Sequence, residues 1–132
     1  MSAKRKHDVA TPNGPVSVFV NVDDVAVTFG SPYVVNGIAY SGTIYVRKSH
    51  AGVWQLGQTF VNRADDWTRE PTDSAWRVMI ATAKNLAEEF YTTDNVNLAR
   101  RELLEFKIES TKRKIADLAD ELAQLKNELR NL

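Results

Sequence analysis

Two histidines are the side chains best suited to acid–base catalysis near neutral pH. His7 lies in a basic N-terminal segment, and His50 lies just before Gly52 in a segment typical of a turn. The chain has no cysteine, so a nucleophile would have to be a serine, and no serine stands in a nucleophile-elbow pattern. We therefore expect solvated histidines, no catalytic residues and a protein that is not an enzyme.

Two pairs of adjacent aspartates are the candidate metal ligands. Asp23–Asp24 separates two apolar segments, and Asp65–Asp66 lies in a charged segment before Trp67. Consecutive side chains of a strand point to opposite faces, so neither pair would chelate an ion by itself. The first pair is typical of a tight turn and the second of a solvated loop. No phosphate-binding loop, zinc spacing or EF-hand loop is present. We expect no metal and no cofactor.

Aromatic and basic residues are interleaved between residues 40 and 63. Rings that stack on bases and cations that contact phosphates are the combination that binds single-stranded nucleic acid. The candidate ligand or nucleic-acid surface consists of Tyr45, Arg47, Lys48, Trp54 and Arg63, with Tyr40 and Phe60 nearby. The alternative is that the rings belong to the core and the charges to a solvated edge. Basic clusters at 4–6 and 112–114 could add contacts or serve only solubility.

The charge balance limits the classes of partner. The chain of 132 residues has 17 Lys and Arg and 17 Asp and Glu, so its formal net charge is zero. This balance disfavours a basic nucleic-acid packager and an acidic DNA mimic. No apolar run reaches the roughly 18 residues of a membrane helix, and no secretory signal is recognisable. We expect a cytoplasmic protein without a membrane partner, in the host cytoplasm if it is encoded by a phage.

The N-terminal half has the pattern of an antiparallel sheet. Residues 1–15 are predicted to be a flexible basic tail that ends in a turn. Residues 16–22 and 25–29 then alternate between apolar and polar types, with Asp23–Asp24 between them. A two-residue loop would pair Val22 with Val25, Val20 with Val27 and Val18 with Phe29.

A second hairpin is predicted at Asn36–Gly37, the residue pair preferred in type I′ turns. It would set Val35 opposite Ile38 and Tyr33 opposite Tyr40. Strands continuing to residue 48 and from 53 to 61 would complete a meander of four to six strands. Gly42 and Gly57 interrupt these strands and indicate bulges or bends.

Two helices are predicted after the strands. The segment Pro71–Ser74 is rich in capping residues, and apolar residues then recur at spacings of three and four from Ala75 to Phe90. This amphipathic helix should cover one face of the sheet. The predicted fold class is therefore α+β, with residues 16–91 as a sheet-plus-helix module and residues 94–132 as a coiled-coil helix.

The last helix contains a heptad repeat. Nine seam positions alternate at spacings of four and three, and all but one are Ile or Leu. They are Leu104, Ile108, Thr111, Ile115, Leu118, Leu122, Leu125, Leu129 and Leu132. Because only this narrow stripe is apolar after residue 112, the helix needs another helix beside it, and we expect self-association as a dimer or tetramer. A trimer, an intramolecular helical hairpin and a different partner protein remain alternatives.

The charges of this helix bear on its orientation. Residues 107–114 are mainly basic and residues 117–128 mainly acidic, which favours antiparallel pairing, although parallel pairing stays open. Thr111 is the one polar seam residue and indicates a weak point where register or partner choice is set.

A non-enzymatic interaction protein fits this organisation best. The coiled coil would present copies of the sheet module to a protein or small-ligand target, as an inhibitor, adaptor or sequestering protein. Small cysteine-free chains of this type are common among phage and mobile-element accessory proteins. The alternative function is single-stranded nucleic-acid binding, since a meander followed by a helix in an oligomer resembles, in topology alone, small single-strand-binding transcription cofactors.

Overall fold

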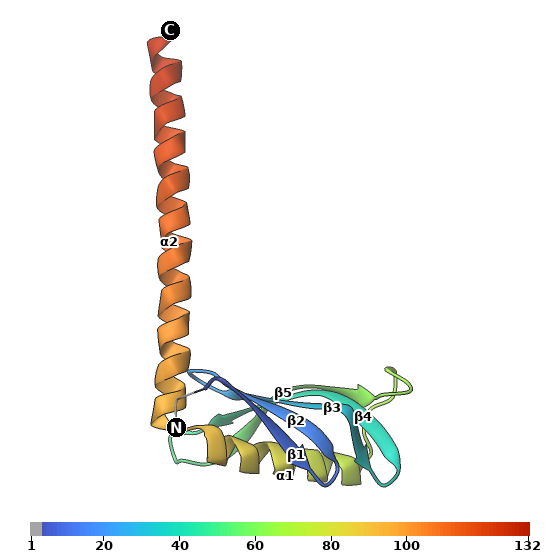
Figure 1. The fold of residues 1–132 in the computed structure, drawn as a ribbon. Helices are drawn as coiled ribbons and strands as arrows, with labels where there is room; N and C mark the ends of the chain where they lie inside the picture. The colour runs from blue at the N-terminus through green and yellow to red at the C-terminus, as the bar shows by residue number, and fades with distance from the viewer. Residues whose placement is uncertain (1–3) are drawn as a thin grey trace. The chain divides into compact units, whose positions relative to one another are not determined.

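A five-stranded antiparallel sheet followed by two helices forms the fold (Figure 1). The computed structural model describes residues 4–132. The strands are β1 (Lys6–Thr11), β2 (Gly14–Val20), β3 (Val25–Val35), β4 (Ile38–Lys48) and β5 (Trp54–Arg63), and the helices are α1 (Asp73–Phe90) and α2 (Thr93–Arg130). The strand order is β1-β2-β3-β4-β5. The predicted α+β class with an antiparallel meander is confirmed.

The N-terminal segment is not the flexible tail that its basic composition predicts. Residues 6–11 form β1, which pairs along its whole length with β2, from Lys6 opposite Phe19 to Thr11 opposite Gly14. The Thr11 hydroxyl donates to the Gly14 carbonyl at 2.7 Å and closes the turn between the two strands. The prediction of a flexible tail was wrong for residues 6–11, because exposed charges on an edge strand hide its short alternation, whereas the turn predicted at the end of this segment lies at residues 12–13. The first three residues of the predicted tail lie outside the described residues.

The first predicted hairpin exists in a different register. Val20 pairs with Val25, Val18 with Val27 and Val16 with Phe29, so the loop spans residues 21–24. Asn21 holds this wider loop, because its side-chain amide donates to Asp24 Oδ1 at 2.7 Å and its backbone N–H donates to the Asp24 carbonyl at 2.9 Å. The valines stay on one face in both registers, since each strand keeps its alternation.

The second predicted hairpin is confirmed in register. Val35 pairs with Ile38 and Tyr33 with Tyr40. Asn36 has φ 51° and Gly37 φ 77°, the positive values that a type I′ turn requires. Gly42 has φ 139°, and a Cβ there would collide with the Phe60 carbonyl oxygen of β5. The close approach of two strands therefore explains this glycine.

The hydrophobic core lies between the sheet and α1. Thr72 caps α1, because its hydroxyl accepts the Ala75 N–H at 3.3 Å. The α1 side chains Ala75, Met79, Ala83, Leu86 and Ala87 are buried in the same cluster as the sheet residues Val16, Val18, Val25, Val27, Phe29, Tyr33, Val35, Tyr40, Ile44, Val46 and Val61. Figure 1 shows α1 running along one face of the sheet. We call this side of the sheet the α1 face and the opposite side the outer face.

The second helix is long and continuous, as predicted. It has 38 residues from Thr93 to Arg130 and contains neither glycine nor proline. Its first turn belongs to the compact unit Met1–Ala99, where Asn95 is buried. The Asn95 side chain accepts the Lys4 N–H at 3.0 Å and donates to the Phe90 carbonyl at 2.8 Å. From Arg100 onward the chain forms the second unit, Arg100–Leu132.

Candidate interaction surfaces

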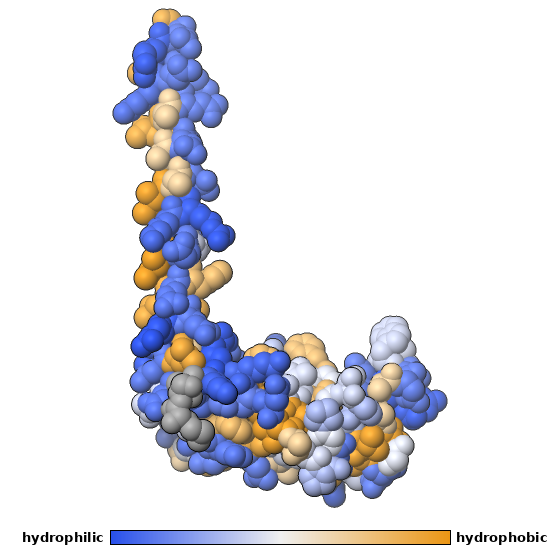
Figure 2. All heavy atoms as spheres, viewed as in Figure 1, coloured by the Kyte–Doolittle hydropathy of each residue, from blue (hydrophilic) through white to orange (hydrophobic). Residues whose placement is uncertain are grey.

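The first candidate surface is the apolar stripe of α2, which we call the seam. It consists of Leu104, Ile108, Thr111, Ile115, Leu118, Leu122, Leu125, Leu129 and Leu132. The Leu and Ile side chains from Leu104 to Leu129 are between 52% and 71% exposed. Figure 2 shows apolar residues following one another along this helix, with hydrophilic residues around them. A row of exposed aliphatic side chains at heptad spacing, with Thr111 as its one polar member, is a surface suited to another helix.

Thr111 fits this surface better than its polarity suggests. Its hydroxyl donates to the Lys107 carbonyl of the preceding turn at 2.8 Å. The hydrogen-bond donor is therefore satisfied within the helix, and a covering helix would leave no unpaired hydroxyl hydrogen. Thr111 also lines a shallow depression of about 280 Å³ with Leu104, Lys107, Ile108 and Lys112. This depression is open to a side chain of a partner.

The second candidate surface is the outer face of the sheet. Tyr45 and Arg47 lie on it, because they alternate along β4 with the buried Ile44 and Val46. The Tyr45 ring meets the ring of Phe60 edge-on, with 6.2 Å between their centres. A depression of about 350 Å³ is lined by Asp24, Tyr45, Val46, Arg47, Gly57 and Gln58. Two of the five predicted ligand-surface residues, Tyr45 and Arg47, thus meet at one depression.

Phe19 is a further outer-face aromatic that the sequence reasoning did not include. Its ring lies 5.7 Å from the ammonium of Lys6, its partner in the β1–β2 pairing. In β2, Phe19 alternates with the buried Val18 and Val20. That alternation was visible in the sequence and could have placed Phe19 on the face opposite the core.

Trp54 and Lys48 lie on the α1 face, away from Tyr45. The Trp54 indole N–H donates to Glu88 Oε2 of α1 at 2.6 Å, and its ring meets Tyr91 edge-on at 5.3 Å. Lys48 Nζ lies 3.6 Å from the same carboxylate oxygen and 5.8 Å from the Trp54 ring centre. The indole hydrogen bond, and after it the Lys48 charge, lowers the pKa of Glu88. These contacts attach β5 to α1, and Trp54 does not share a stacking surface with Tyr45.

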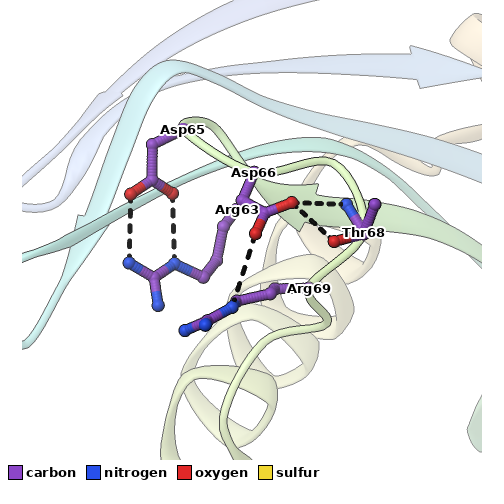
Figure 3. Close-up of polar contacts among 5 residues, drawn as sticks. All are labelled: Arg63, Asp65, Asp66, Thr68 and Arg69. Carbon is purple, nitrogen blue, oxygen red and sulfur yellow. Dashed lines mark hydrogen bonds and ion pairs between the residues drawn. The ribbon is translucent and has the colours of Figure 1, made fainter.

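Arg63 is held by the loop that follows β5 (Figure 3). Its Nε and Nη2 donate to the two carboxylate oxygens of Asp65, each at 3.1 Å, and this pair raises the Arg63 pKa. Asp66 accepts the Thr68 hydroxyl at 2.6 Å and the Thr68 N–H at 3.0 Å, and these bonds lower its pKa. Asp66 also lies 3.4 Å from Arg69 Nε. The two aspartates thus organise the loop, and Arg63 is engaged within it.

The remaining chemically suggestive residues also have structural contacts. His7 belongs to β1, where its ring stacks on Phe90 at 4.4 Å, while His50 is exposed in the turn after β4. Tyr40 is completely buried in the core. Across residues 4–132, no group of three or more His, Cys, Asp or Glu side chains is placed to hold a metal ion. Over the same part of the chain, neither helix has the length and apolar character needed to span a membrane.

Comparison of the chain with protein-family models, with curated proteins and with solved structures gave no match. Function is therefore inferred from the chain's own residues. The two surfaces differ in kind, since the α2 seam is aliphatic except for Thr111 and the outer face is a mixed aromatic and polar surface. The seam carries eight exposed Leu and Ile side chains, and a helix partner is the ligand that their spacing fits.

Proposed function

We propose that the protein is a non-enzymatic interaction protein that self-associates through the α2 seam and presents copies of its sheet module to a target. The observation that carries this proposal is the row of heptad-spaced Leu and Ile side chains, each at least 52% exposed from Leu104 to Leu129. Leaving such a stripe in water costs free energy, because full burial of a Leu or Ile side chain is worth about 1.5–3 kcal/mol. Pairing with a second copy covers it.

The sheet module is the part offered to the target. In this proposal α1 covers one face of the sheet, which is supported by its five buried residues in the common core: Ala75, Met79, Ala83, Leu86 and Ala87. The outer face, with Tyr45, Arg47 and Phe60, is left for a protein or small-ligand target. Two or more linked copies bind a repeated target with higher avidity than one copy does. An inhibitor, adaptor or sequestering protein works in this way, and phage accessory proteins of the host cytoplasm belong to this class.

Light scattering on the full chain after size exclusion tests the proposal. Self-association predicts a mass that is a multiple of 14.8 kDa. A mass of 14.8 kDa throughout the micromolar range would contradict it. The matched variant is Leu118→Asp, which places a charge in the middle of the seam and should give the single-chain mass, since a buried unpaired charge is costly. The same change at Asn127, away from the seam, should leave the oligomer intact.

Single-stranded nucleic-acid binding is the second candidate function. It is favoured by the Tyr45–Phe60 ring pair and by Arg47 on the same face of the sheet. A shift of labelled single-stranded DNA that weakens with salt and is lost in Tyr45→Ala would support it. Trp54→Ala is the matched control, because Trp54 lies on the α1 face and its loss should not change the shift. Equal loss in both variants would argue against stacking on the outer face.

A further inference from the structure

We propose that the α2 seam pairs with the α2 seam of a second copy in an antiparallel orientation and in one defined register. In this register Ile108 faces Leu125 of the second copy, and Ile115 faces Leu118 of the second copy. Leu104 faces Leu129 in the same way. The inference rests on the proposed self-association, and it specifies how the two copies meet.

The charges beside the seam carry the inference. With Ile108 at heptad position a, the flanking g positions are Lys107, Lys114, Glu121 and Glu128, and the flanking e positions are Glu105, Lys112, Ala119 and Lys126. In an antiparallel pair, g residues face g residues and e residues face e residues across the seam. Such flanking charges set the orientation and the partner of paired helices.

The g positions are complementary in this register. Lys107 lies opposite Glu128 of the second copy, and Lys114 lies opposite Glu121. Because the pair has two-fold symmetry, each of these contacts occurs twice. The e positions are also compatible, since Glu105 lies opposite Lys126. The only other e contact sets a lysine opposite Ala119, so no like charges meet.

Neighbouring arrangements bring like charges together. If the second helix is shifted by one heptad in one direction, Glu121 faces Glu121 of the second copy and Lys112 faces Lys126 of the second copy. If it is shifted by one heptad in the other direction, Lys114 faces Lys114 of the second copy and Lys112 faces Lys112 of the second copy. A parallel pair has favourable contacts at Glu121 and Glu105 but sets Lys107 against Lys112. Of these four arrangements, the proposed register alone has no like-charge contact, and like charges across a seam disfavour that pairing.

The position of Thr111 in the seam is compatible with the same register. It faces Leu122 of the second copy, whereas a parallel pair would set two threonines opposite each other in the core. Its hydroxyl already donates to the Lys107 carbonyl at 2.8 Å. A leucine opposite it therefore covers the threonine methyl group without leaving a buried donor unpaired.

The antiparallel register has a consequence for function. The compact unit that carries the sheet ends at Ala99, and the second unit begins at Arg100. In the proposed pair the two Arg100 residues lie near opposite ends of the paired helices, roughly 50 Å apart at about 1.5 Å per residue. The two sheet modules are thus attached at separate ends. A repeated target would therefore be bound from two separate attachment points.

A charge reversal at one position separates the orientations. Lys107→Glu sets like charges against Glu128 in the proposed register and should weaken the dimer about tenfold, since it changes two symmetric pairs. Adding Glu128→Lys in the same chain should restore the dissociation constant to within about twofold. In a parallel pair, Lys107→Glu would instead meet Lys112 and strengthen the dimer, which would overturn the proposal. Neither Lys107 nor Glu128 has a charged side chain three or four positions away in the same helix. The substitutions therefore change no ion pair within one helix, and the change in dissociation constant reports on the contact between helices.

Asp120→Lys is the matched control for charge reversal. Asp120 occupies position f, opposite the seam, and its reversal should change the dissociation constant by less than about twofold. Lys107→Glu, its double variant with Glu128→Lys, and Asp120→Lys all alter exposed side chains. Circular dichroism checks that each variant keeps the helix content of the wild type. A Lys107→Glu chain that dimerises as tightly as the wild type would overturn the proposed register.

Disulfide cross-linking tests the register independently. Because the chain has no cysteine of its own, an introduced cysteine can form a disulfide only with another introduced cysteine. A mixture of Leu104→Cys and Leu129→Cys chains should form a mixed disulfide, while neither variant alone should form one. Disulfides within each variant alone would show a parallel pair and overturn the inference. If sedimentation shows only monomers, the proposed self-association fails. If it shows dimers without the mixed disulfide, self-association stands and the register fails.

Discussion

Truncation of Leu122 to alanine should weaken self-association by an amount that follows from its exposure. Leu122 is 52% exposed in the single chain, so about half of its burial remains to be gained from a partner. Full burial of a leucine is worth about 2 kcal/mol, so that half is worth about 1 kcal/mol per chain. A dimer contains two copies, and the total of about 2 kcal/mol corresponds to roughly a 30-fold higher dissociation constant.

Sedimentation equilibrium over a concentration series measures this change. Alanine is the best helix former, so Leu122→Ala does not weaken the helix itself. The control is Phe106→Ala, because Phe106 is 68% exposed on the same helix but occupies position f, away from the seam. Its truncation should leave the dissociation constant unchanged. If Leu122→Ala dimerises like the wild type, or if both variants lose affinity equally, the seam is not the contact surface.

Three further predictions concern single residues. Thr111→Leu should raise the melting temperature of the oligomer, since it replaces the one polar seam residue, and unchanged melting would argue against a polar weak point at that position. Glu88 has a lowered pKa in the folded protein, so its contact with Trp54 contributes stability that is present above its ordinary pKa of 4.5 and lost as the pH falls through the lowered value. Urea unfolding of wild type and Glu88→Gln should therefore differ at pH 7 and converge in acid, and a difference independent of pH would contradict the role of the carboxylate. Gly42→Ala should reduce the free energy of unfolding by more than about 2 kcal/mol, because φ 139° and the adjacent carbonyl of β5 leave no room for a Cβ. A urea midpoint like that of the wild type would contradict the close strand contact.

The parts of the fold that follow local rules could be predicted from the sequence. Asn36–Gly37 requires positive φ at both residues, and the hairpin register followed from it. The Pro71–Ser74 segment contains the α1 cap, Thr72. The heptad spacing indicated a long helix, and α2 is continuous from Thr93 to Arg130. In each case the chemistry of a few neighbouring residues determines the conformation.

The parts that depend on distant contacts could not be predicted in this way. Strict alternation along β5 places Trp54 and Phe60 on one face, but the register shifts between Ile44 and Val46 of the paired strand. Gly57 indicated a bulge or bend, but its effect on the faces depends on the pairing: one extra residue of β5 beside it reverses them. Trp54 therefore contacts α1, and Phe60 joins Tyr45 on the outer face. This irregularity separates Trp54 from Phe60, and ordinary alternation along β4 separates Lys48 from Arg47.

Two other features were not predicted from the sequence: the length of the loop between β2 and β3, and the pairing of the edge strand β1. The loop after Val20 is wider than the two aspartates indicated, because Asn21 bonds across it to Asp24. The strand β1 was missed because half of its side chains face solvent and two of these, Lys6 and Asp8, carry charge, as is usual for an edge strand. Both errors concern which residues pair, and pairing is determined by contacts that alternation alone does not specify.

Sedimentation equilibrium of the unmodified full chain in the micromolar range tests the central claim, self-association through α2, most directly. The proposed antiparallel pair predicts a mass of twice 14.8 kDa that falls toward the single-chain value on dilution. A mass of 14.8 kDa at every concentration would contradict the claim, because the exposed aliphatic seam would then remain in water without a partner.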